Sequence, residues 1–209
     1  WQEIYREYNC DLPFEEWVAC VGGTDQHFDP YANLEAALGQ TLPREDIMAK
    51  RWRRHMMLIE ELSLLPGVER YVNEARRLGL KIGLASNSSR EWVQGHLQRL
   101  GLYDQFDVTK CGDEVSNQKP DPELYLAVLD ELKLPAEQAV AFEDSSHGVL
   151  AARRAGIFCV AVPNAITRHL PLDHASLRLT SLADVPLEAL LAQVEKQQKE
   201  AAQLSLHDN

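Results

Sequence analysis

The chain has 209 residues, and its 21 lysines and arginines against 32 aspartates and glutamates give a formal net charge of −11. It is 45% hydrophobic and 25% charged, close to a soluble globular protein, and it is long enough to bury a real core. The acidic balance argues against a general binder of nucleic acid or anionic membranes, and the longest clearly apolar run, Ile157 to Val162, is far below the ~20 residues of a membrane helix.

Residues 1–63 are predicted to form a domain built from helices alone. Short helices are expected at residues 1–8 and 13–21, and a longer one over residues 44–62. An apolar stripe repeats along this last helix at helical period, which predicts a packing face, and arginines on the other side predict a face in solvent. The stripe consists of Met48, Trp52, Met56 and Ile59, and the arginines are Arg51, Arg53 and Arg54.

Residues 64–209 change to an alternation of helices and strands. Strands are expected at residues 80–84, 106–109, 139–142 and 157–162, with amphipathic helices between them and a polar tail over residues 195–209. This alternation predicts a doubly wound parallel sheet in an α/β domain. Ligands of such sheets bind outside the carboxyl ends of the strands, so the residues after each strand carry the functional information.

Small polar side chains follow the first strand and lead into a helix. The segment Ser86-Asn87-Ser88-Ser89 offers hydroxyl and amide donors at a helix N-terminus, where the helix dipole favours an anion. The segment suits a phosphate group, although in isolation a plain helix cap, for which Ser88 alone suffices, is the simpler explanation.

Charged residues follow the next two strands. Lys119 precedes Pro120, which favours an extended backbone and could project the ammonium at a fixed point, although a lone lysine is usually a surface charge. Glu143 and Asp144 follow the third strand, and two adjacent carboxylates there repel each other unless a cation compensates. Mg²⁺ is the natural compensator, because it takes one or two carboxylates together with waters and phosphate oxygens.

These three signals, in this order, resemble the haloacid dehalogenase superfamily over essentially the whole chain. Ser86 in GLASNSS resembles its second motif, Lys119 in QKPDPELY its third, and Glu143-Asp144 in FEDSSHG its fourth. The resemblance is strongest to the β-phosphoglucomutase-like and phosphoglycolate-phosphatase-like branch, whose helical cap residues 1–63 match. It implies a Rossmann-like core over residues 64–209 and an all-helical cap.

The same resemblance implies phosphoryl transfer through an aspartyl-phosphate. Ser86 and Lys119 are then the catalytic residues and bind phosphate with Asn87, while Glu143 and Asp144 hold Mg²⁺. The first motif of the family, DxDxT with the nucleophilic aspartate, is not found in this sequence. The chain is therefore expected to begin inside the first cap helix, without the central strand of the sheet.

The cap loop favours a phosphatase over a mutase. In the resemblance, Thr24, Gln26 and His27 select the substrate, and Gln26 stands where a β-phosphoglucomutase has an arginine for its second phosphate. Two rivals stay open: a sugar phosphomutase, and a catalytically silent binding protein if no nucleophile exists. The long helical cap and the late acidic pair argue against a receiver-type signalling domain.

The remaining expectations concern partners and location. Four cysteines, Cys10, Cys20, Cys111 and Cys159, are scattered without a CxxC pair, which is typical of reduced thiols in a cytoplasmic protein. The first ten residues are polar and do not form a signal peptide. We expect a cytoplasmic monomer that binds a small phosphorylated metabolite, a sugar or polyol phosphate, and neither nucleic acid nor membrane.

Overall fold

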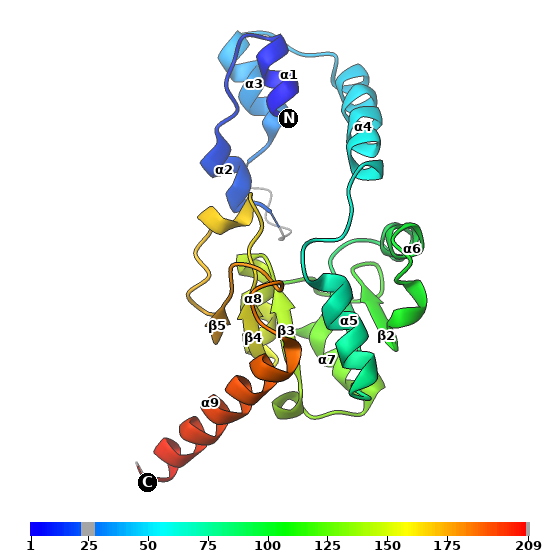
Figure 1. Cartoon of the computed structure of the whole chain (residues 1–209). Helices are drawn as coiled ribbons and strands as arrows, with labels where there is room; N and C mark the ends of the chain where they lie inside the picture. The colour runs from blue at the N-terminus through cyan, green and yellow to red at the C-terminus, as the bar shows by residue number, and fades with distance from the viewer. Residues whose placement is uncertain (22–27, 208–209) are drawn as a thin grey trace. The chain divides into compact units, whose positions relative to one another are not determined.

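The computed structural model describes residues 1–21 and 28–207, and the chain falls into two compact units, Trp1–Ser63 and Leu64–Asn209 (Figure 1). In its described part the first unit is helical, with α1 (Gln2–Glu7), α2 (Phe14–Ala19), α3 (Pro30–Leu38) and α4 (Arg44–Glu60). The sequence patterns did not predict α3, which begins where the Asp29 carboxylate accepts a hydrogen bond from the Tyr31 N–H at 2.9 Å. A small core joins α1, α3 and α4; its buried members are Ile4, Tyr5, Leu34, Leu42 and Ile47.

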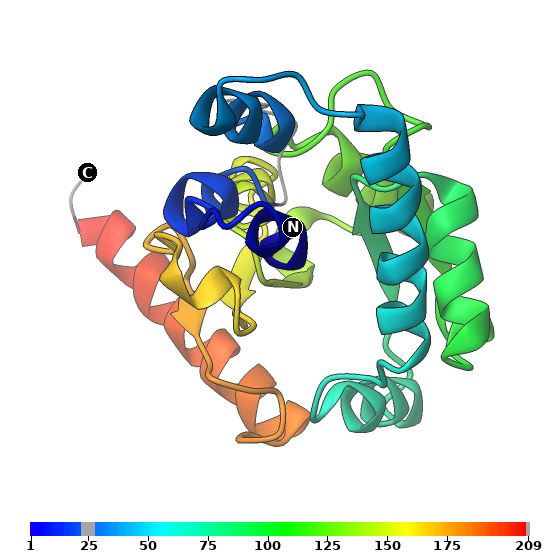
Figure 2. The same cartoon turned by 90° about the horizontal axis from the view of Figure 1, so that it is seen from above.

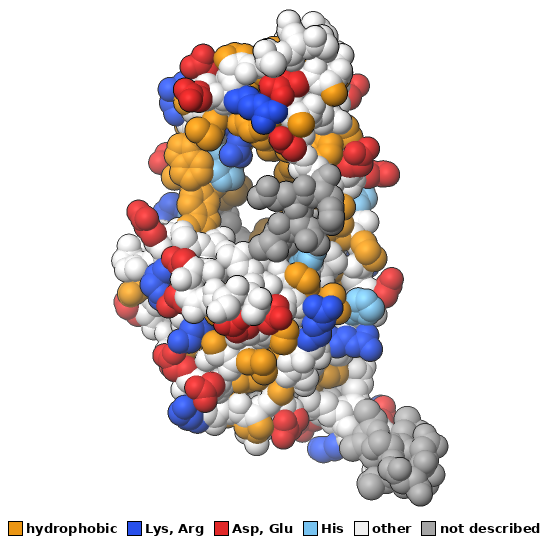
Figure 3. Space-filling view, turned by 180° about the vertical axis from the view of Figure 1, so that it is seen from behind, with side chains coloured by type: hydrophobic (Ala, Val, Ile, Leu, Met, Phe, Trp, Pro, Cys, Tyr) orange, Lys and Arg blue, Asp and Glu red, His pale blue; other side chains and the backbone are white. Residues whose placement is uncertain are grey.

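The predicted packing face of α4 is only partly covered: Met56 and Ile59 are half-buried, whereas Met48 and Trp52 are exposed. Met48 is 54% exposed and Trp52 49% exposed, and Figure 3 shows hydrophobic side chains gathered over this helix. On the charged side, Lys50 pairs with Glu7 of α1 at 2.6 Å and Arg54 pairs with Glu3 at 2.9 Å, but these side chains are all about half exposed, so this side lies in solvent as predicted. Helical period therefore located the charged face correctly, whereas much of the apolar stripe remains uncovered in the described residues.

The second unit alternates helices and strands. In chain order it contains α5 (Val68–Arg77), β1 (Gly83–Ser86), α6 (Arg90–Arg99), β2 (Val108–Cys111), α7 (Glu123–Leu132), β3 (Val140–Glu143), α8 (Ser146–Arg154), β4 (Phe158–Ala161), β5 (Leu177–Arg178) and α9 (Leu187–His207). Short 3₁₀ turns lie at Tyr103–Gln105, Ala136–Gln138 and Thr167–His169. The predicted parallel α/β fold is thus confirmed, and the polar tail lies mostly within α9.

All strand pairings are parallel, but they form two sheets rather than one. β1 pairs with β2 from Gly83 opposite Val108 to Ser86 opposite Cys111. β3 pairs with β4, which also pairs with the short strand β5. No pairing joins β1 to β3 in the part of the chain that the structure describes, so each of these strands has one unpaired edge (Figure 2).

Helices cover both faces of the two sheets. On one face, α5 packs Val72 with α6 against β1 and β2, and packs Tyr71 with α9 against β4. On the other face, α7 packs Val128 against β2, and packs Leu129 with α8 against β3 and β4. Consecutive residues of α5, and likewise of α7, therefore bind different sheets, so these two helices hold the sheets together.

Over residues 1–21 and 28–207, no helix combines the length and apolar character needed to cross a bilayer.

Candidate active site

The residues singled out from the sequence follow strand ends in the second unit. β1 ends at Ser86. β3 ends at Glu143, one residue later than predicted, so Glu143 is the last residue of that strand and Asp144 is the first residue after it. The Glu143 carbonyl is bound by the Val162 N–H at 2.7 Å, which places the ends of β3 and β4 together. The carboxyl ends of these parallel strands therefore carry the candidate residues.

Lys119 joins the two sheets. The residue is only 7% exposed, and its Nζ donates to the Ala85 carbonyl of β1 at 2.9 Å and forms an ion pair with the carboxylate of Glu143 on β3. A buried ammonium needs such partners, because burial without them is costly. A lone lysine is usually a surface charge, but Lys119 is buried.

Asn87 holds the backbone of Lys119. Its Oδ1 accepts from the Lys119 N–H at 2.8 Å, and its Nδ2 donates to the Lys119 carbonyl at 3.2 Å. The Ser86 hydroxyl accepts from the Ser88 N–H at 3.1 Å, which closes a tight turn after β1. The helix cap of α6 is Ser89, whose hydroxyl accepts from the Trp92 N–H. Ser86, Asn87 and Lys119 thus lie together, and their binding of phosphate stays a prediction.

Glu143 is enclosed on three sides. It is 8% exposed, and its Oε1 accepts hydrogen bonds from Lys119 and from the Tyr125 hydroxyl. Its Oε2 lies over Gly148 in the first turn of α8, where an added Cβ would fall 1.9 Å from that oxygen. The absence of a side chain at Gly148 therefore makes room for the carboxylate, which no larger residue would leave in place.

Asp144 is held by a residue of the loop after β4. The side-chain Nδ2 of Asn164 donates to the Asp144 carboxylate at 2.8 Å, and its side-chain Oδ1 accepts from the N–H groups of Ile166 and Thr167. Burial raises the pKa of Asp144 above its usual range, and the adjacent charge of Glu143 raises it further, against the opposing hydrogen bond from Asn164. The ionised form of Asp144 is therefore short of positive charge.

This shortage fits a divalent cation. One ammonium, that of Lys119, faces two neighbouring carboxylates, and its hydrogen bond goes to Glu143. Mg²⁺ is satisfied by one or two carboxylates with waters and phosphate oxygens, so the donor set of Asp144 with Glu143 is chemically suitable. Because Glu143 already binds Lys119 and Tyr125, Asp144 is the better placed of the two.

Another group of potential metal ligands is already satisfied within the fold. In the described part of the chain, Cys111, Asp113 and Glu114 are the one group of three whose ligand atoms lie within 4.8 Å of one another. Glu114 forms an ion pair with Arg90 at 2.6 Å, and Asp113 accepts from the Arg90 N–H at 3.0 Å. These contacts tie the start of α6 to the end of β2, and we assign this group no metal.

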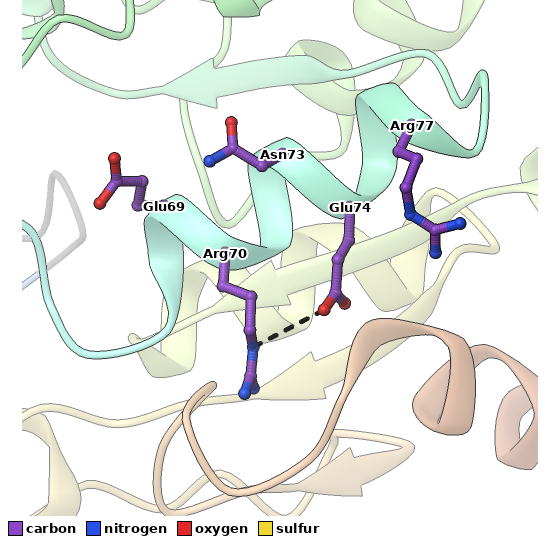
Figure 4. Close-up of a pocket in the computed structure, with 5 residues that line it drawn as sticks. All are labelled: Glu69, Arg70, Asn73, Glu74 and Arg77. Atoms are coloured by element: carbon purple, nitrogen blue, oxygen red, sulfur yellow. Dashed lines mark ion pairs between the residues drawn. The ribbon is translucent and has the colours of Figure 1, made fainter.

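A hollow of about 390 Å³ lies along one side of α5 (Figure 4), and none of the candidate site residues lines it. Its arginines are occupied: Arg70 donates to the Leu182 carbonyl at 2.8 Å, and Arg77 donates to Glu188 at 2.8 Å. The arginines beside the hollow thus connect α5 to the segment leading into α9 and to the start of α9 itself. Its lining residues are Glu69, Arg70, Asn73, Glu74 and Arg77.

Some predicted site residues fall beyond the part of the chain that the structure describes, and two contacting residues were not predicted. The predicted substrate-selecting loop residues Thr24, Gln26 and His27 lie outside the described residues. Sequence reasoning missed Tyr125 as a partner of Glu143, and Asn164 as a partner of Asp144. Tyr125 follows Lys119 by six residues on the first turn of α7, and Asn164 follows a strand, so strand-end position was the available signal for Asn164.

Comparison with known proteins gives a consistent result. Residues 1–162 match the sequence profile of a family described as haloacid dehalogenase-like hydrolases. The chain is 42% identical over 196 residues to the phosphatase candidate YhcW of Bacillus subtilis (strain 168), covering 94% of this chain and 89% of YhcW. It is 30% identical over 178 residues to the β-phosphoglucomutase of the same species, covering 84% of this chain and 71% of that enzyme.

Solved structures agree in fold. A crystal structure of a CbbY mutant from Rhodobacter sphaeroides in complex with xylulose 1,5-bisphosphate superposes with a TM-score of 0.64 at 29% identity, covering 88% of this chain and 85% of that one. A β-phosphoglucomutase candidate from Thermotoga maritima superposes with a TM-score of 0.68 at 27% identity and the same coverage.

Proposed function

The chain belongs to the haloacid dehalogenase-like hydrolase family, and from that premise we propose that it is a Mg²⁺-dependent phosphatase acting on a small sugar or polyol phosphate. One observation carries the proposal. A buried ammonium, that of Lys119, bridges the ends of β1 and β3, with the Ser86 turn on one side and the Glu143-Asp144 pair on the other.

Each residue has a chemical part in this proposal. Lys119 and the Ser86 hydroxyl bind the equatorial oxygens of the phosphoryl group, where negative charge is spread in the transition state. Asn87 keeps Lys119 in place through its backbone. Asp144, with Glu143 beside it, holds Mg²⁺, which supplies Lewis-acid neutralisation of phosphate charge when bound.

The proposal requires an aspartate nucleophile that forms the aspartyl-phosphate. The family's first motif supplies it, and the printed sequence contains no match to that motif. The unpaired edges of β1 and β3 support a place for one more strand, because an exposed strand edge is a template for pairing. Activity is therefore to be tested on protein made from the complete gene.

A screen of phosphorylated sugars and polyols tests the function, with p-nitrophenyl phosphate as a general substrate and released phosphate as the readout. We expect turnover that stops in excess EDTA and returns with Mg²⁺. Lys119→Ala and Asp144→Asn should each lose roughly 10²–10³ in rate, the usual effect of removing a transition-state charge contact. Equal turnover in EDTA would contradict the metal assignment, and more than a tenth of wild-type rate in either variant would contradict the residue roles.

A phosphomutase is the second candidate, because the β-phosphoglucomutase of Bacillus subtilis is 30% identical to this chain. The two activities differ in product. A phosphatase releases inorganic phosphate from glucose 1-phosphate or glucose 6-phosphate, whereas a mutase interconverts the two in the presence of a sugar bisphosphate. If neither product forms with the complete protein, a catalytically silent binding protein becomes the better interpretation.

A further inference from the structure

We propose that Tyr125 is a positioning residue, which fixes the Lys119 ammonium by binding both that ammonium and its counter-ion, Glu143. The inference rests on the proposed function for its catalytic consequence, and on the geometry of three side chains for the rest. The Tyr125 hydroxyl donates to the same Glu143 oxygen that accepts from Lys119. The Lys119 Nζ also lies over the Tyr125 ring, 4.9 Å from the ring centroid.

The phenol is itself held firmly. Tyr125 lies on α7 and packs against a buried cluster that includes Leu129, Ala141 and Cys159. This packing places the hydroxyl within hydrogen-bond reach of the Glu143 carboxylate, to which it donates.

Lys119 needs such support because a lysine side chain is a flexible four-carbon stem with rotatable donors. Asn87 fixes only its backbone, so the position of the ammonium depends on Ala85, Glu143 and the ring of Tyr125. Without the Tyr125 hydroxyl, Lys119 would be the remaining donor to Glu143 Oε1. Small errors in the placement of a catalytic group are costly, up to about a hundredfold in rate for ~1 Å.

The test compares Tyr125→Phe with Tyr71→Phe. Both remove one tyrosine hydroxyl from the second unit, and the Tyr71 hydroxyl donates to the Val185 carbonyl at 2.8 Å, outside the site. The first readout is the ¹⁵N–¹H NMR signal of the Lys119 side-chain ammonium, assigned by its loss in Lys119→Arg. A buried ion pair slows exchange with water, so the wild-type signal should be sharp.

We expect Tyr125→Phe to broaden or shift this signal and Tyr71→Phe to leave it unchanged. The second readout is kinetics on p-nitrophenyl phosphate with the complete protein. Because hydrogen bonds to charged groups are stronger than neutral ones, losing this one in Tyr125→Phe should lower kcat roughly tenfold to a hundredfold, with a smaller change in KM. Tyr71→Phe should keep wild-type kcat even where it unfolds at a lower temperature.

The inference would be overturned by a sharp, unshifted Lys119 signal in Tyr125→Phe, or by a wild-type kcat in that variant. Equal losses of kcat in the two variants would also overturn it, because a purely structural role then suffices. The NMR readout does not require turnover. If the wild-type protein hydrolyses no phosphate ester, the proposed function fails, while a Lys119 signal that changes only in Tyr125→Phe still supports the positioning.

Discussion

Replacing Lys119 with methionine tests whether the charges at the centre of the site are buried as a pair. The side chains of Lys119 and Glu143 are 9% and 7% exposed. Methionine keeps most of the lysine's length and removes its charge, which leaves an uncompensated carboxylate in the interior. Removing one partner of a buried ion pair costs about 3–5 kcal/mol. Because folded domains are stable by only ~5–15 kcal/mol, this loss is a large part of the total.

Urea unfolding followed by circular dichroism measures the effect as a change in the free energy of unfolding. Lys196→Met is a matched control, because Lys196 is 77% exposed and its ion pair with Glu200 lies in solvent. Exposed pairs contribute about 0–1 kcal/mol, so this control should unfold near the wild-type midpoint. The double variant Lys119→Met with Glu143→Gln should recover much of the loss, since it removes the stranded charge as well.

Two results would refute this reasoning. If Lys119→Met and Lys196→Met unfold at the same urea concentration, the carboxylate of Glu143 is not buried as an anion. If the double variant is as unstable as Lys119→Met alone, the loss comes from the lysine's other contacts and not from Glu143.

Three further predictions address the surroundings of the site. Asn164→Ala should weaken Mg²⁺ binding, measured by isothermal titration calorimetry, by about 10–100-fold, because residues that orient metal ligands have effects of that size; an unchanged affinity would remove Asn164 from the site. Gly148→Ala places a Cβ 1.9 Å from the Glu143 carboxylate and should lower the free energy of unfolding by about 1–3 kcal/mol. Gly95→Ala on α6, where the added Cβ meets open space, should not lower it. Equal midpoints of urea unfolding for the two variants would contradict the crowding at Gly148. Burial raises the pKa of the Cys159 thiol to about 12 from an ordinary value of 9.0. As pH rises, the thiol of the unfolded chain loses its proton before the buried thiol does. The free energy of unfolding should therefore fall from pH 8 to 10 more steeply in wild type than in Cys159→Ala. Equal slopes of unfolding free energy against pH in the two proteins would contradict this prediction.

Strand-end position was the part of the site that the sequence could predict. Alternation of strands and helices indicated a parallel sheet, and parallel strands end at the edge where ligands bind, so Ser86, Lys119 and Glu143 could be picked out before their contacts were known. Their mutual geometry could not be predicted. The ion pair of Lys119 with Glu143 spans 24 residues of sequence, and no local pattern specifies it.

The misses have a common physical cause in contacts between distant segments. Asn164 looks like an ordinary loop residue until the amide is seen bound to Asp144, 20 residues earlier. Helical period in α4 identified an apolar side, but whether such a side is covered depends on other segments, and Met48 and Trp52 stay about half exposed. In both cases the partner, and not the residue's own pattern, determines the role.

The division of the second unit into two sheets has a mechanical consequence. Between β1 and β3 the described residues share no ladder of backbone hydrogen bonds. The two halves are joined by the packed side chains of α5 and α7, and by Lys119 through its bonds to Ala85 and Glu143. Such packing is non-directional and short in range, so it resists separation less than a ladder loaded in shear. Pulled apart in an optical trap through handles at Leu84 and Ala141, the two halves should part at low force, while each sheet stays intact.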